Sequence, residues 1–78
     1  MIIFIDNTIR GRVVLNINFD IFVKLIKSQN KILDKTRVFI TYIYTTGSVD
    51  FLFETPELRD VEYEKILLKV EESSPKVF

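Results

Sequence analysis

The 78 residues of this chain include no cysteine, which rules out a disulfide framework for its fold. A domain of this size buries only roughly 60% of the surface that its unfolded chain exposes, and many such domains add disulfides or a structural metal. Histidine is absent as well, so the usual zinc ligands are missing. We therefore expect one domain over residues 1–78, held by its apolar core or by association, with residues 72–78 as a flexible tail.

The first half of the chain predicts a hairpin followed by a helix. Residues 1–5 are β-branched and aromatic, residues 6–11 form a polar connection that contains Gly11, and residues 12–19 alternate apolar and polar side chains. Asp20 is a candidate N-cap for a helix over residues 20–35. Six apolar residues of that segment fall within about a 140° arc at helical spacing: Ile21, Phe22, Leu25, Ile26, Ile32 and Leu33.

The second half repeats this order. Residues 37–45 and 49–53 read as two strands joined by a turn at Thr46 and Gly47. Thr55, Pro56 and Glu57 then supply an N-cap, a proline at the first helical position and an acid near the positive helix end. These signals predict a second helix that starts there and continues to about residue 72.

The fold class expected from these elements is α+β, with an antiparallel four-stranded sheet packed by two helices in the order ββαββα. Residues 66–71 also alternate as a strand would, which leaves open a ferredoxin-like βαββαβ order with an extra N-terminal strand. The good helix formers between residues 62 and 68, and the lack of a turn residue there, favour the continuous helix.

Catalysis is disfavoured by the residue types that are missing. Without histidine or cysteine, the common paired nucleophiles cannot be built. Gly11 and Gly47 lie too far apart in sequence to form a phosphate-binding loop and read as turn glycines. We therefore expect a protein that is not an enzyme and that has no catalytic residues, no metal site and no cofactor.

Charged residues suggest two ridges of opposite sign. On the expected helices, a basic ridge comprises Lys24, Lys27, Lys31 and Lys35, and an acidic ridge comprises Glu57, Asp60, Glu64 and Glu71. Ordinary solvation accounts for both, and the formal net charge of zero argues against a dedicated binder of phosphate backbones. A nucleic-acid-binding accessory protein that uses the basic ridge is the alternative function.

Apolar residues left over on the second helix predict a homodimer. Leu58, Val61 and Leu68 fall in an arc separate from the core-facing residues, and one amphipathic stripe cannot bury both sets. Phe39 and Ile43 are expected to add apolar surface on the far face of the sheet. Across such a dimer, the basic ridge of one copy would lie near the acidic ridge of the other.

The function expected from the sequence is therefore that of a small interaction or regulatory protein, self-associating and with a further protein partner that the sequence does not identify. No segment approaches the roughly 20 apolar residues of a membrane span, so we expect a cytoplasmic protein that binds no membrane. The residue usage implies AT-rich codons. Together with the small size, it suggests a phage, virus or mobile-element protein, which would act in the host cytoplasm.

Overall fold

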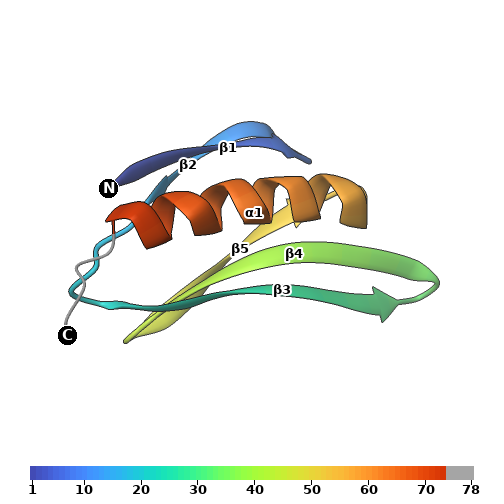
Figure 1. Cartoon of the computed structure of the whole chain (residues 1–78). Coiled ribbons are helices and arrows are strands. Elements are labelled where there is room, and N and C mark those ends of the chain that lie inside the picture. The colour runs from blue at the N-terminus through green and yellow to red at the C-terminus, as the bar shows by residue number, and fades with distance from the viewer. Residues whose placement is uncertain (74–78) are drawn as a thin grey trace.

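A computed structural model describes residues 1–73, which form a single domain of five strands and one helix (Figure 1). The elements in chain order are β1 (Ile2–Thr8), β2 (Gly11–Asn16), β3 (Phe22–Ile32), β4 (Lys35–Tyr44), β5 (Gly47–Phe53) and α1 (Pro56–Ser73). Of the tail expected over residues 72–78, the first two residues belong to α1, and residues 74–78 lie outside the described residues.

The strands form one antiparallel sheet in the order β2-β1-β5-β4-β3. The helix packs against β1, β3, β4 and β5, and Figure 1 shows it running between the β1–β2 hairpin and the three-stranded unit of β3, β4 and β5. The core lies beneath α1. Its buried side chains come from all six elements and from the segment after β2: Ile3, Ile5, Leu15, Ile17, Leu25, Val38, Ile40, Tyr42, Phe53, Ile66 and Val70.

The expected two-helix folds, ββαββα and its ferredoxin-like alternative, are wrong. Residues 20–35 form no helix: most of them lie in β3, which pairs with β4 along nearly its whole length, and Leu33 and Asp34 form the turn between these strands. A register shift between Phe22 and Lys24 changes the alternation within β3 and so conceals its two-residue period. Strand β4 also needs a partner on this edge, and the long-range pairing with β3 outweighs the local helical spacing.

The other expected elements are confirmed. Both hairpins form, and Gly11 has a φ of 83°, the left-handed conformation for which a turn glycine is suited. The helix begins as expected, because Leu58 N–H donates to the Thr55 hydroxyl at 3.2 Å and Pro56 occupies the first helical position. It runs without interruption to Ser73, so residues 66–71 are helical.

Strands β1 and β5 pair at a single residue position. Thr8 and Phe53 form their only residue pair, next to a hydrogen bond of 3.0 Å from Ile9 N–H to the Leu52 carbonyl. Strand β1 is irregular just before this point, where the register shifts between Ile5 and Thr8 and Asn7 has a φ of 64°. From this junction the β1–β2 hairpin and β5 diverge (Figure 1), and the space between them contains the candidate groove described below.

Candidate functional site

The helix carries apolar side chains on two faces. Ile66 and Val70 are buried against the sheet, whereas Val61 and Leu68 are each 57% exposed and Leu58 is 36% exposed. We call Leu58, Val61 and Leu68 the helix stripe. The structure thus places all three on the side of α1 that the core leaves uncovered, as the sequence predicts.

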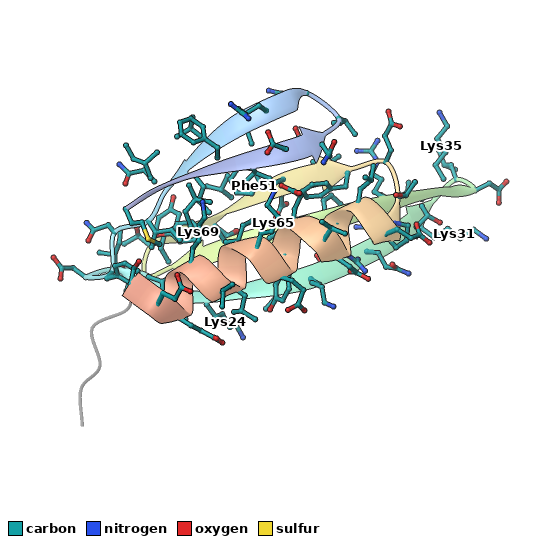
Figure 2. The ribbon with its side chains drawn as sticks, turned by 45° about the horizontal axis from the view of Figure 1, so that its top comes forward. Lys24, Lys31, Lys35, Phe51, Lys65 and Lys69 are labelled. Atoms are coloured by element: carbon teal, nitrogen blue, oxygen red, sulfur yellow. The ribbon has the colours of Figure 1, made fainter. Side chains whose placement is uncertain are left out.

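The basic ridge does not exist as a ridge, because its helix is absent. By strand register, Lys24 and Lys35 lie on one face of the β3–β4 hairpin and Lys27 and Lys31 on the other. Figure 2 shows Lys31 and Lys35 at the far tip of that hairpin and Lys24 near the other end of β3. The four lysines therefore present no continuous surface to a phosphate backbone.

The acidic ridge lies on α1 as expected, but one of its residues, Asp60, forms ion pairs within the chain. Asp60 Oδ1 lies 3.7 Å from Lys27 Nζ and 3.1 Å from Arg59 Nε. The Lys27 ammonium also lies over the Tyr63 ring, 5.2 Å from its centroid. Lys27 and Asp60 thus join β3 to α1 within one protomer, whereas the predicted ridges would pair these residues across a dimer. Glu57, Glu64 and Glu71 are exposed.

Two buried charged residues of α1 escaped the sequence analysis. Glu62 is 1% exposed and accepts the backbone N–H of Asp6 at 2.9 Å. Arg59 is 8% exposed and donates to the Ser28 carbonyl at 3.0 Å. At helical spacing, Arg59 and Glu62 lie on the same face of α1 as the core residue Ile66. This shared face was the sequence signal that they are buried. Because each completes hydrogen bonds of the sheet, we interpret both as structural groups that anchor α1.

Asp6 joins this network from the surface. The Arg12 Nε donates to its carboxylate at 2.7 Å, and Lys65 Nζ lies 3.8 Å from Asp6 and 3.3 Å from Glu62. The hydrogen bond from Arg12 holds the pKa of Asp6 below its ordinary value, and Asp6 in turn raises the pKa of Arg12. The Arg12 and Asp6 side chains are 66% and 35% exposed, so this cluster reads as a surface ion pair.

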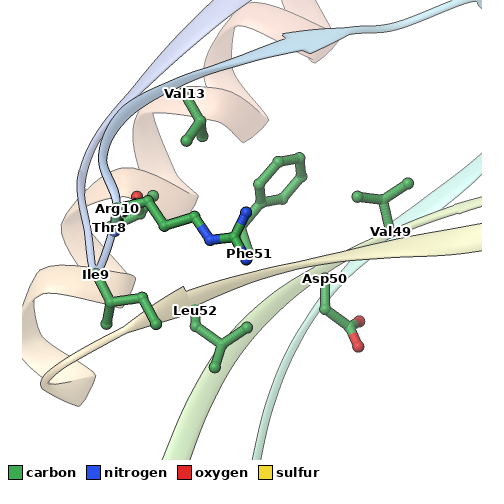
Figure 3. Close-up of a pocket in the computed structure, with 8 residues that line it drawn as sticks. All are labelled: Thr8, Ile9, Arg10, Val13, Val49, Asp50, Phe51 and Leu52. Atoms are coloured by element: carbon green, nitrogen blue, oxygen red, sulfur yellow. Dashed lines mark hydrogen bonds between the residues drawn. The ribbon is translucent and has the colours of Figure 1, made fainter.

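A groove runs between the β1–β2 hairpin and β5. Two adjoining hollows make it up, of 380 Å³ near the junction of the strands and 450 Å³ towards β4, and Val49 and Phe51 line both. We call this the strand groove. Figure 3 shows Val13 of β2 opposite Phe51 of β5, with Arg10 extending from the β1–β2 turn across the first hollow. No sequence pattern predicts this groove, because it arises where β1 and β5 pair at a single position and then diverge.

Among residues 1–73, no three carboxylates come close enough to hold a metal ion. Over the same range, no helix is long and apolar enough to cross a membrane. The strand groove is lined mainly by apolar side chains, with Arg10 and Asp50 as its charged members. Its chemistry suits binding of an apolar partner.

Comparison with known proteins yields no relative, since no family model, curated protein or solved structure matches the chain.

Proposed function

We propose that this chain is a small, non-enzymatic interaction protein that works as a homodimer and binds a further protein. The helix stripe carries the proposal. Val61 and Leu68 are each 57% exposed on a helix whose opposite face already fills the core. Exposed apolar residues that continue along one helix face mark interaction surfaces in small proteins.

The energy available from such a contact supports self-association. Burying a fully exposed apolar side chain of this size contributes roughly 1.5 to 3 kcal/mol, and about half of that is available to side chains that are 57% exposed, before association costs are subtracted. A two-fold axis would place the helix stripe of one copy against that of the other, since a symmetric contact presents the same patch from both partners. The exposed acids beside the stripe, such as Glu64, would lie at the polar rim of the contact.

Light scattering after size exclusion tests the dimer. We expect a mass of twice 9.2 kDa at high micromolar concentration, and we expect Leu68→Glu to return it to 9.2 kDa. Leu33→Glu is the matched control, because Leu33 is 92% exposed at the far hairpin tip and the same substitution there leaves the helix stripe intact. A monomeric wild type would refute self-association, and a Leu68→Glu dimer would refute this surface.

From its composition, we also propose that this chain is a phage, virus or mobile-element protein. It would act in the cytoplasm of the host cell. The experiment is expression of the chain at native level in a candidate host with fractionation of the cells. Recovery in the cytosolic fraction is the expected result, and recovery with the membranes would contradict it.

A further inference from the structure

Strand β5 has backbone groups that face the strand groove without a partner strand. The Leu52 carbonyl accepts Ile9 N–H at 3.0 Å, so the N–H and C=O of Leu52 point towards β1. In an antiparallel strand, every second residue points its backbone groups to the same side. Ser48 and Asp50 therefore point the same way, yet within residues 1–73 β5 is paired on that side only at its end, where Phe53 lies opposite Thr8 and the Leu52 carbonyl accepts Ile9 N–H.

Strand β2 offers a second free edge. Met1 and Ile17 exchange two hydrogen bonds, of 2.7 and 2.8 Å, so Ile17 directs its backbone groups to the β1 side. By the same alternation, Val14 and Asn16 direct theirs away from β1. Strand β2 ends the sheet of the described residues, and both Val14 and Asn16 line the strand groove. Strand β2 therefore contributes residues to the wall of the groove opposite β5, and the unpaired backbone groups on the β1 side of β5 are those available to an occupant.

The side chains of the groove favour an apolar occupant. Val49 is 41% exposed and Val14 is 56% exposed, and half-buried Phe51 lies between the two hollows. A small apolar molecule would cover these side chains but would leave the backbone groups of Ser48 and Asp50 unpaired. An extended peptide satisfies both, because its backbone pairs with the strand edge while alternate side chains enter the groove.

The charge of Arg10 favours an acidic residue at one end of that peptide. Arg10 lines the first hollow, is exposed, and forms no salt bridge with any of residues 1–73. Asp50, the other charged residue of this hollow, already accepts the Thr41 hydroxyl at 2.8 Å. A carboxylate placed at the mouth of the groove would pair with the Arg10 guanidinium in the geometry that arginine favours.

We infer that the strand groove is a docking site for an extended segment of a partner protein, which adds a strand beside β5. The segment is apolar at alternate positions and places an acidic residue at Arg10. The site is separate from the helix stripe and goes beyond the proposed homodimer, so that either can fail without the other.

Selection of peptides tests the site directly. A phage-displayed library of random peptides, about nine residues long and so the length of a typical strand, is panned against the full chain, with Val49→Arg as the counter-selected variant. Val49 is 41% exposed, so the arginine fills the groove mouth with little cost to the core. We expect enriched peptides with alternating apolar residues and Asp or Glu at one end. Panning against Arg10→Glu should replace that acid with Lys or Arg.

Hydrogen exchange then locates the bound peptide. In the free chain, we expect the Ser48 and Asp50 amides to exchange fast and the Val49 and Phe51 amides, which face β4, to be protected. Saturating the chain with a selected peptide should slow Ser48 and Asp50 by at least about tenfold.

Three results would overturn the inference. The first is a lack of enrichment over the Val49→Arg variant, and the second is an enriched peptide that leaves the Ser48 and Asp50 amides unchanged. The third is a Val49→Arg variant that turns a wild-type dimer into a monomer, which would make the occupant a second copy of this chain. If Val49→Arg does not fold, panning against Arg10→Glu tests the site instead. Peptides selected on that variant that keep their acidic residue would then overturn the inference.

Discussion

The Glu62 carboxylate accepts the backbone N–H of Asp6 at 2.9 Å, at the irregular point of β1 where the register with β2 shifts. A bulged strand leaves a backbone donor without a ladder partner, and here a side chain from α1 supplies the acceptor. Glu62 is 1% exposed, so water does not substitute for it. The bulge and the helix therefore stabilise each other.

Removal of this acceptor should destabilise the fold. We expect Glu62→Ala to lower the free energy of unfolding by about 1 to 3 kcal/mol, because it leaves the partly buried Asp6 N–H without its acceptor. Glu62→Gln retains an acceptor oxygen and should cost less. Urea denaturation measures both, with exposed Glu64→Gln as the control that stays within about 0.5 kcal/mol of wild type. Equal losses for the alanine and glutamine variants would contradict this role.

The Asp6–Arg12 pair should appear in the pH dependence of stability. The hydrogen bond from Arg12 lowers the pKa of Asp6 in the folded chain. A lowered folded pKa contributes stability above the unfolded value of about 3.9, and this contribution is lost as the pH falls through the folded pKa. The stability difference between wild type and Asp6→Asn should therefore be largest above that value and vanish in stronger acid.

Carbon-detected titration of the Asp6 carboxyl group measures the same effect at the residue. We expect Arg12→Gln to move the pKa of Asp6 back towards its ordinary value, since the largest cause of the shift is then removed. Arg10→Gln is the control, because Arg10 forms no salt bridge with Asp6. An Asp6 pKa that is unchanged in Arg12→Gln would show that the pair does not persist in solution.

Arg59 should hold the edge strand β3 to the helix. Its guanidinium donates to the Ser28 carbonyl at 3.0 Å and to the Gln29 side chain at 3.4 Å. We expect Arg59→Ala to destabilise the chain by about 1.5 to 3 kcal/mol, the range for hydrogen bonds to charged groups. Faster hydrogen exchange should concentrate in β3. Arg59→Lys, which lacks the planar fork, should recover only part of the loss.

How far the sequence predicts this structure depends on whether its signals are local. Thr55 and Pro56 define the start of α1 because a cap and a first-turn proline act within a few residues. The same local reasoning fails for β3, whose apolar residues have helical spacing while its partner β4 is supplied by the following segment. It also misses Glu62 and Arg59, because their partners Asp6 and Ser28 come from distant strands.

The candidate sites divide in the same way. The helix stripe follows from helical spacing alone, and the structure leaves Val61 and Leu68 exposed as expected. The basic ridge depended on a helix that does not form, so Lys24 and Lys27 lie on opposite faces of β3. The strand groove depends on where β1 leaves β5, which is set by one residue pair of Thr8 with Phe53 and has no signal in either strand alone.

The turn between β3 and β4 gives the sharpest test of the hairpin against the helix expected from the sequence. Leu33 and Asp34 have φ values of 51° and 64°, between the paired residues Ile32 and Lys35. Two central residues with positive φ are typical of a type I′ turn, for which Asn-Gly is the preferred sequence. The left-handed conformation costs a residue such as leucine about 1 to 2 kcal/mol.

The double substitution Leu33→Asn with Asp34→Gly should therefore stabilise the chain. Leu33 is 92% exposed, so its replacement gives up almost no packing. We expect a gain of about 1 kcal/mol, which for a domain of this size raises Tm by about 4 to 8 °C. If residues 20–35 were instead helical, glycine near the helix end would lower Tm or leave it unchanged, because glycine is about 1 kcal/mol worse than alanine inside a helix. Thermal unfolding followed by circular dichroism distinguishes the two outcomes by the sign of the change in Tm.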